Sequence, residues 1–253
     1  MAPRLFGFID SYSLMLFLGV ALAVAVFEIY FRIHLRENRR IFYLELCVGI
    51  ALILGIAGAY LMQNLYNFVE NPASFTWSWS LTFYGGALFG AGGFLLTYFL
   101  YSRKKYPGSI WLVLRIFPAC ICGAHALGRI GCFLEGCCYG KPTDAWYGVQ
   151  FATTATKVIP TNLFEAMFLF VLFGLFLFLA FRYDSDFSVS TYMMAYGAFR
   201  FAIEFFRDDH RGAWIPGLTP SQFWSILLFV GGVGLLIFFL IRRKRALTYG
   251  SEE

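Results

Sequence analysis

The chain has 253 residues, of which 59% are hydrophobic and only 14% carry a charge. Soluble globular domains contain about 25% charged residues, so this composition excludes a water-soluble fold. The formal net charge is +5. Because the basic residues lie where membrane topology places them, the charge does not indicate a nucleic-acid partner.

Apolar blocks of roughly 20 residues follow one another along the chain, and a helix of this length crosses about 30 Å of hydrocarbon. The seven blocks are 12–30, 42–62, 81–101, 109–127, 163–181, 188–206 and 222–241. The sequence therefore predicts an all-α integral membrane protein with seven transmembrane helices. We expect a single transmembrane domain over residues 1–253.

The distribution of Lys and Arg predicts the orientation of these helices. Basic residues gather after the first, third, fifth and seventh blocks, which all lie on one side of the membrane. Cytoplasmic loops carry such an excess. Residues 63–80, on the other side, contain no Lys or Arg, and Trp77 and Trp79 are typical of an interfacial aromatic belt. The N-terminus is thus expected outside and the C-terminus inside.

The sixth block contains ionisable residues that a membrane span should not tolerate without a reason. Tyr196, Arg200, Glu204 and Arg207 are spaced i, i+4, i+8 and i+11, which predicts one helical stripe. One explanation is an Arg200–Glu204 ion pair that only fixes the helix bundle. The two arginines outnumber the glutamate, which favours a bound anion such as phosphate.

The segment that follows the fourth block is rich in polar residues and glycine. If the helix continues to Cys132, then His125, Arg129 and Cys132 share one face at i, i+4 and i+7. Glycines expose backbone N–H groups and let chains approach closely, which suits a polar lipid headgroup. We expect residues 128–161 to form an outward-facing segment.

Two other spans carry candidate site residues. In the third, Gly86 and Gly90 form a small-xxx-small pair typical of helix packing, which does not account for Tyr84 beside it. The fifth opens with residues 160–162, typical of a helix start. Glu165 lies a turn further inside, where a capping role explains it poorly.

The six cysteines are Cys47, Cys120, Cys122, Cys132, Cys137 and Cys138. The last five lie within nineteen residues, beside His125, which makes a metal site one alternative. Cys120 and Cys122 are spaced C-x-C, and Cys137 and Cys138 are adjacent. Metal sites commonly use C-x-x-C pairs instead, so we expect no metal ion. No organic cofactor is required either. A disulfide in the segment and a nucleophilic cysteine remain open alternatives, although a Cys137–Cys138 bridge would be strained.

The run from Gly128 to Thr143, GRIGCFLEGCCYGKPT, resembles the signature of prolipoprotein diacylglyceryl transferases. Residues 83–86 (FYGG), 160–166 (PTNLFEA) and 196–207 agree in order, so the resemblance covers nearly the whole chain. It implies a multi-pass enzyme of the bacterial cytoplasmic membrane with an outward-facing active site. In the implied reaction, the lipobox cysteine thiol in a prolipoprotein signal peptide attacks the glyceryl carbon of phosphatidylglycerol, and glycerol phosphate leaves.

The resemblance also implies roles for individual residues. Arg129 and Arg200 match the family's arginines and are expected to hold the lipid phosphate. The other expected substrate-binding residues are Tyr12, Gly85, Gly86, Cys132, Glu135, Gly140, Glu165, Tyr196, Glu204 and Arg207.

The chain departs from the family pattern where a base would be expected. Tyr84 replaces the usual histidine before Gly85-Gly86, and Cys132 replaces an asparagine. A neutral phenol is a poor base at neutral pH, so His125 is the better candidate to accept the thiol proton. A histidine that only packs is the alternative. Two other functions remain open: a related headgroup or glyceryl transferase with a different acceptor, and a non-catalytic protein that binds or transports anionic lipid.

Overall fold

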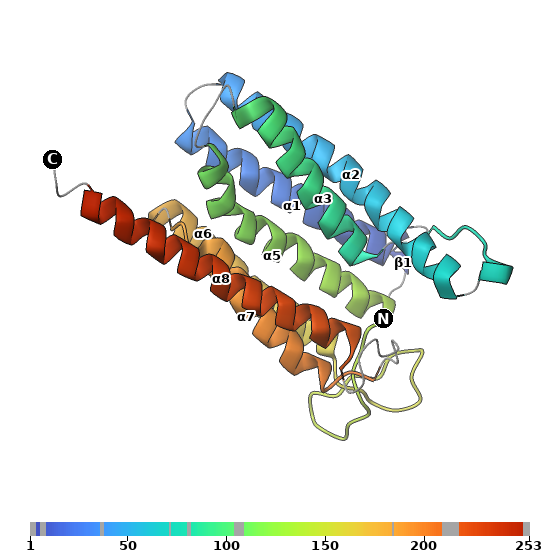
Figure 1. Cartoon of the computed structure of the whole chain (residues 1–253). Helices are drawn as coiled ribbons and strands as arrows, with labels where there is room; N and C mark the ends of the chain where they lie inside the picture. Colours follow the sequence, from blue (N-terminus) through green and yellow to red (C-terminus); the bar gives the residue numbers. More distant parts are fainter. Residues whose placement is uncertain are drawn as a thin grey trace. The chain divides into compact units, whose positions relative to one another are not determined.

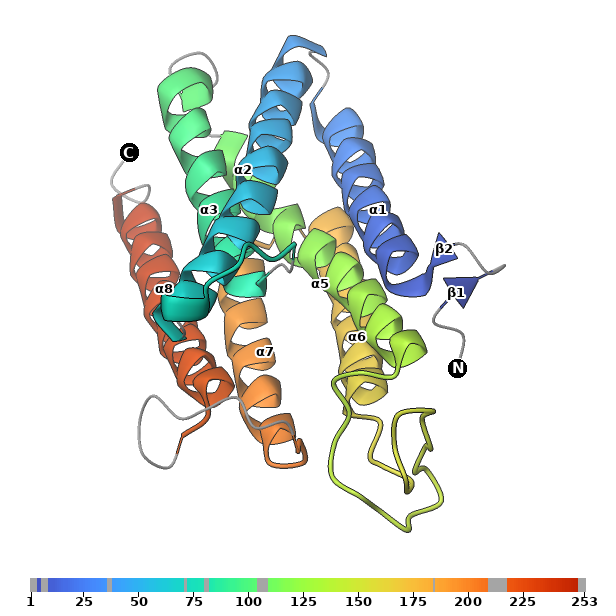
Figure 2. The same ribbon diagram turned by 90° about the vertical axis from the view of Figure 1, so that its right-hand side faces the viewer.

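The structure, a computed structural model, describes residues 4–5, 9–35, 38–70, 72–79, 82–103, 109–183, 185–208 and 218–249. In these ranges the helices are α1 (Ser11–His34), α2 (Asn38–Glu70), α3 (Phe83–Thr97), α5 (Ser109–Glu135), α6 (Thr161–Arg182), α7 (Ser188–Glu204) and α8 (Pro220–Tyr249) (Figures 1 and 2). The shorter elements are the antiparallel strands β1 (Arg4–Leu5) and β2 (Ile9–Asp10), the 3₁₀ turn η1 (Pro72–Ser74) and the π-helical turn η2 (Tyr98–Ser102). The predicted helical class is confirmed for the described residues.

Several of these helices could cross a membrane. In the described part of the chain, five are long and apolar enough: Ser11–His34, Ile41–Val69, Ile110–Glu135, Thr161–Arg182 and Pro220–Lys244. A shorter apolar stretch covers Leu88–Tyr101. Large apolar side chains lie on the protein surface, among them Phe17 (69% exposed), Ile53 (68%) and Val171 (70%). Such a surface is costly in water but suits lipid, so these helices fit a multi-pass membrane protein.

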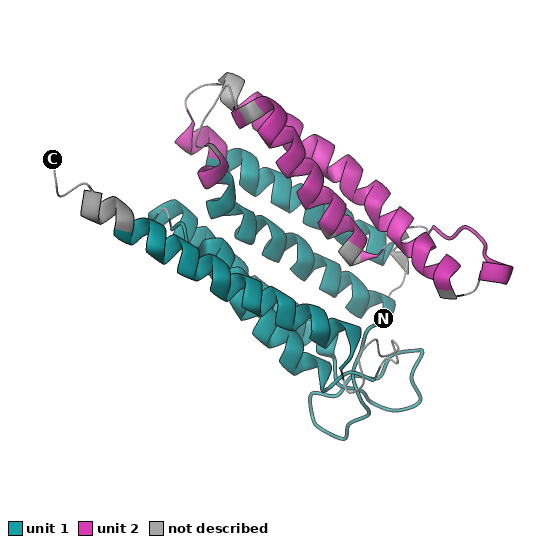
Figure 3. Cartoon of the chain, viewed as in Figure 1, with its two compact units in different colours: residues 1–30, 113–253 teal, residues 31–112 magenta. Residues whose placement is uncertain are grey.

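The chain forms two compact units, residues 1–30 with 113–253 and residues 31–112 (Figure 3). In the second unit, α2 packs closely against α3 through small residues. A Cβ atom on Gly86 would lie 3.5 Å from Ala59 Cβ, and one on Gly90 would lie 3.3 Å from the Ala51 carbonyl oxygen. The small-xxx-small pair of Gly86 and Gly90 therefore forms a helix-packing face, as its spacing predicted.

The first unit contains α1, α5, α6, α7 and α8. Here too, small residues let helices approach each other: a Cβ atom on Gly19 of α1 would lie 2.8 Å from the Ala124 carbonyl oxygen of α5. Likewise, a Cβ atom on Gly197 of α7 would lie 2.9 Å from the Ser225 carbonyl oxygen of α8. This close packing brings the polar residues of neighbouring helices within reach of one another.

A long loop joins α5 to α6 and lies beyond the ends of both helices (Figure 2, yellow-green). Helix α5 ends where Gly136 adopts a left-handed conformation with φ 76°, which glycine tolerates best. Further along, Val158 forms antiparallel bridges with Pro142 and Val149, and Gly140 forms one with Arg207 just after α7. The loop is thereby tied to the end of α7.

Candidate active site

Glu165, in the second turn of α6, is completely buried and joins three helices. Its Oε2 atom lies 3.1 Å from Nε of Arg129 on α5 and 3.6 Å from Nη1 of Arg200 on α7. Its Oε1 atom accepts a 2.8 Å hydrogen bond from the Tyr196 hydroxyl and lies 3.7 Å from Nε2 of His125. Burying an unpaired carboxylate costs several kcal/mol of free energy, and these contacts offset that cost for Glu165.

The ionic contacts continue along α7. Oε2 of Glu204 lies 2.9 Å from Nη2 of Arg200 and 3.8 Å from Nε of Arg207. The charges therefore alternate from Arg129 through Glu165, Arg200 and Glu204 to Arg207, and the series begins and ends with arginine. The stripe predicted on the sixth span is present. Its Arg200–Glu204 pair is not an isolated bundle contact, because Arg200 also reaches Glu165.

The first turn of α8 supports this charge network. Arg200 donates a 3.1 Å hydrogen bond from Nη2 to Ser221 Oγ, and Thr219 donates a 2.9 Å hydrogen bond from Oγ1 to Glu204 Oε1. Thr219 and Gln222 also form a reciprocal capping box: each backbone N–H donates to the other's side chain, at 3.1 and 3.2 Å. The residues at the start of α8 therefore also position a partner for Glu204.

His125 lies next to the same network. Its ring centroid is 5.3 Å from that of Tyr196, which in turn stacks on Tyr192 at 5.8 Å. With 12% of its side chain exposed and Glu165 at 3.7 Å, His125 lies between aromatic rings and a carboxylate. This position suits a group that receives a proton and a group that packs, so both predicted roles remain.

The loop after α5 is held in place by the first residues of α6. Thr161 donates a 3.1 Å hydrogen bond to the Cys138 carbonyl oxygen, and Asn162 donates a 2.8 Å one to the Cys137 carbonyl oxygen. Gly140 packs so tightly that an added Cβ atom would overlap the Phe206 carbonyl oxygen and lie 2.8 Å from Thr161 Cγ2. This fixes the turn between α5 and Gly140 next to the arginines.

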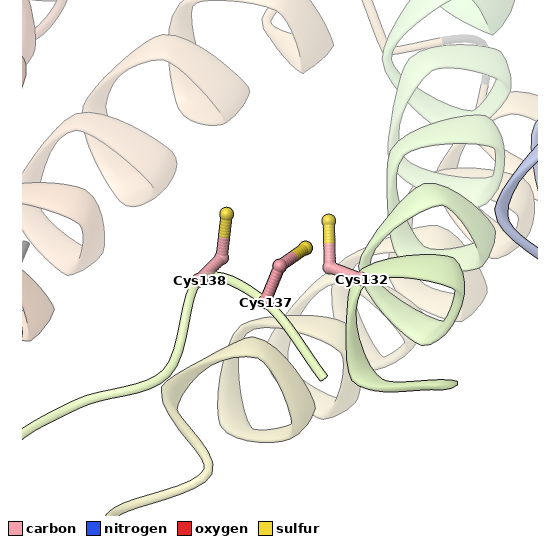
Figure 4. Close-up of side chains that lie close together, drawn as sticks. All are labelled: Cys132, Cys137 and Cys138. Atoms are coloured by element: carbon pink, nitrogen blue, oxygen red, sulfur yellow. The ribbon is translucent and has the colours of Figure 1, made fainter. Parts of the chain in front are cut away.

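The turn brings three cysteines together. The sulfur atoms of Cys132, Cys137 and Cys138 all lie within 4.8 Å of one another (Figure 4). Hydrogen bonds with the Cys132 and Cys137 thiols lower the pKa of the Cys138 thiol, and the charges of Arg207 and Arg129 lower it further. These three sulfur atoms are the kind of ligand that a soft metal ion prefers.

The structure brings most of the predicted site residues together in the first unit. His125, Arg129, Glu165, Tyr196, Arg200, Glu204 and Arg207 make the contacts above. Tyr12 of α1 lies against α5, where a Cβ atom on Gly131 would be 3.1 Å from the Tyr12 ring. Cys132 lies on the last turns of α5, and Gly140 lies in the segment that follows it.

Other predicted residues lie elsewhere. Glu135 is exposed at the last residue of α5 and takes no part in the ion pairs found among the described residues. Gly85 and Gly86 lie in the second unit, where they pack against α2. Tyr84 is in α3, but its side chain falls outside the described residues.

Sequence reasoning missed some of the supporting residues. Ser221, Thr219 and Asn162 lie at the starts of α8 and α6, and each donates or accepts a hydrogen bond that positions the site. A signal was present, because Ser221 and Asn162 are polar residues next to apolar spans. A capping role alone would not require them to be buried, as they are here.

The residues of this site lie in a region that known proteins share. The family described as prolipoprotein diacylglyceryl transferase matches residues 4–238, which include every residue of the network. This chain belongs to that family. A phosphatidylglycerol–prolipoprotein diacylglyceryl transferase of Clostridium tetani is 31% identical over 250 residues, covering 96% of this chain and 97% of its own length.

Two other relatives of the same family support the match. A Clostridium perfringens protein named phosphatidylglycerol–prolipoprotein diacylglyceryl transferase 2 is 31% identical and covers 91% of both chains. The Campylobacter curvus enzyme is 31% identical over 79% of this chain and 75% of its own length. The expected family is thus confirmed, and the buried network lies within the region shared with its members.

Proposed function

We propose that this chain transfers the diacylglyceryl group of phosphatidylglycerol to the lipobox cysteine thiol in the signal peptide of a prolipoprotein. The single observation that carries the proposal is the meeting of Arg129 and Arg200 at one buried carboxylate oxygen, in a member of this transferase family. Within the described part of the chain, neither arginine has a carboxylate to itself. Two guanidinium groups held together in an apolar surrounding suit a phosphate group.

The reaction forms a C–S bond and breaks a C–O bond. The sulfur attacks the glyceryl carbon, and the electron pair of the broken bond stays on the departing glycerol phosphate. Negative charge therefore grows on a phosphate oxygen. Arg129 and Arg200 would stabilise this charge, and Glu165 and Glu204 would keep both guanidinium groups oriented before the lipid arrives.

The thiol must also lose a proton before it attacks. We assign this proton to His125, directly or through water, because it lies one helical turn from Arg129 and beside Glu165. Tyr12, Tyr196 and Gly140 would shape the binding site, as their positions around the network suggest. No organic cofactor takes part in these steps.

For the membrane, we propose seven spans forming one transmembrane domain in the bacterial cytoplasmic membrane, with the N-terminus outside and the C-terminus inside. Helices α3 and α7 would provide the two remaining spans, the third and the sixth along the chain, besides the five long ones. The basic loops support this orientation. The segment 128–161 would then face outward, where secreted precursors arrive.

The test is a transfer assay with purified chain in detergent, phosphatidylglycerol and a peptide that contains a lipobox cysteine. The expected product is a diacylglyceryl adduct on the cysteine, detected by mass spectrometry, with release of glycerol phosphate. A peptide with serine in place of this cysteine is the control. Release of glycerol phosphate with a different acceptor, or lipid binding without turnover, would contradict the proposal.

A further inference from the structure

Three thiols converge at the end of α5. Cys132 is on the last turns of the helix, while Cys137 and Cys138 are on the turn that follows it (Figure 4). Their sulfur atoms lie within 4.8 Å of one another. Cys132 is buried and the other two are half-buried. The residue spacing along the sequence argued against a metal ion, but folding supplies a third ligand that the spacing did not reveal.

The surrounding fold holds this arrangement in place. Cys138 has a φ of 59°, a left-handed conformation that residues other than glycine adopt only where the structure enforces it. Thr161 and Asn162, both completely buried, hold the carbonyl groups of Cys138 and Cys137. The convergence of the thiols therefore does not depend on a bond between them.

The spacing of the sulfurs suits a thiophilic ion. Zinc binds thiolates at about 2.3 Å, which places the sulfurs of a tetrahedral site about 3.8 Å apart. Sulfurs within 4.8 Å of one another would have to approach each other by at most about 1 Å to reach this geometry. Three protein ligands leave the fourth position open, which is the arrangement of catalytic zinc, whereas structural zinc has four.

Two arginines of the network lie near the cluster. Arg207 and Arg129 both act electrostatically on the Cys138 thiol. Arg207 is held near the turn by the backbone bridge between Gly140 and Arg207. Arg129 lies one helical turn before Cys132 on α5. The thiols thus lie beside two of the arginines of the network, close to where the lipid phosphate would bind.

We propose that Cys132, Cys137 and Cys138 bind a zinc-class divalent ion through three thiolates, and that the open fourth position takes the acceptor cysteine of the signal peptide. The second part of this inference rests on the proposed function. The acceptor would be held as a metal-bound thiolate, next to the arginines that receive the departing phosphate.

The step balances without any redox partner. The acceptor thiol binds the ion and loses its proton, which passes through water to His125. The bound sulfur forms a bond to the glyceryl carbon, and the C–O bond breaks with its electron pair on glycerol phosphate. The sulfur becomes a thioether, which carries no charge and binds zinc weakly, so the product leaves and the fourth position reopens.

The first test measures metal binding by the full chain in detergent. The protein is reduced with a phosphine, incubated with Zn²⁺ or Co²⁺ and desalted, and the metal is counted by mass spectrometry. We expect one ion per chain and, with Co²⁺, a sulfur-to-metal charge-transfer band. Cys132→Ser, Cys137→Ser and Cys138→Ser should each lose the ion and the band. Cys47→Ala and Cys120→Ala, which change cysteines outside the cluster, should keep both.

The second test adds the acceptor. A lipobox peptide should change the Co²⁺ charge-transfer band, and the same peptide with serine in place of cysteine should not. Retention of the ion in all three serine variants would overturn the site, as would a disulfide within the cluster together with no metal binding after reduction.

The transfer assay separates this inference from the function on which it rests. Full transfer by metal-free protein in the presence of a chelator would overturn the role of the ion while the proposed function stands. One ion bound by the three cysteines, a peptide that does not change the band, and no adduct under any condition would support the site and contradict the transferase function.

Discussion

The Tyr196 hydroxyl donates a 2.8 Å hydrogen bond to Oε1 of Glu165, so the two carboxylate oxygens have different partners. Oε1 faces Tyr196 and His125, whereas Oε2 faces Arg129 and Arg200. The tyrosine thereby fixes the carboxylate in the orientation that holds both guanidinium groups. Because Glu165 and Tyr196 lie on different helices, the orientation of the arginines depends on how α6 packs against α7.

We predict that Glu165→Gln destabilises the protein and abolishes transfer. The substitution leaves Arg129 and Arg200 without the carboxylate they share, and breaking a buried ion pair costs about 3–5 kcal/mol. Unfolding by SDS in micelles measures the stability, and the transfer assay measures the rate. Glu135→Gln is the matched control, because Glu135 is exposed at the end of α5. Equal stability and rate in the two variants would refute the central role of Glu165.

We predict that Arg129→Ala and Arg200→Ala each lower the transfer rate by at least about 10²–10³-fold, the usual cost of losing one charge-stabilising donor in a dry site. Lysine at either position should restore only part of the rate, since an ammonium group lacks the planar fork that matches phosphate. Arg182→Ala, at the last residue of α6, is the control. A near-normal rate in either alanine variant, in protein that is correctly folded by circular dichroism, would remove that arginine from the phosphate site.

We predict that His125→Gln lowers the transfer rate at neutral pH and that higher pH restores much of it. A free thiol has a pKa of about 8.5, so alkaline buffer supplies thiolate without a proton acceptor. Transfer rates of both proteins between neutral and alkaline pH provide the measurement. A constant ratio of rates across this range would show that His125 only packs against Tyr196.

The sequence predicted some features of these residues and not others. Periodicity alone identified the stripe on α7, because i, i+4 spacing within one helix is independent of the rest of the fold. Composition identified Glu165 as a charge that an apolar span must explain. Its partners could not be predicted, because His125 and Arg129 come from α5 and Arg200 from α7. Their meeting depends on the rotation of each helix, which packing decides.

The cysteine cluster also could not be predicted from sequence, although its three residues lie close together in the chain. Cys132 and Cys138 are close because Gly136 and Cys138 both adopt left-handed conformations, at φ 76° and 59°. Glycine makes the first of these predictable from sequence. The second is imposed on a cysteine by tertiary contacts with Thr161 and Asn162 at the start of α6, which no local pattern reveals.

We predict that Gly140→Ala destabilises the turn that carries the cysteines. An alanine Cβ atom would overlap the Phe206 carbonyl oxygen and crowd Thr161, so the loop must move away from α7 or α6. Overpacking of this kind costs about 1–3 kcal/mol, and movement of the loop would also displace Arg207, which bridges to Gly140.

The matched control is Gly174→Ala in α6, where an added Cβ atom meets nothing within 4 Å and alanine favours the helix. Limited proteolysis of the 136–160 loop, SDS unfolding and the transfer rate measure the three consequences. The prediction requires faster cleavage, lower stability and slower transfer in Gly140→Ala alone. If Gly140→Ala were cleaved no faster than Gly174→Ala, the turn would not depend on the close approach of Gly140 to Phe206, and the loop would have to be held by other contacts.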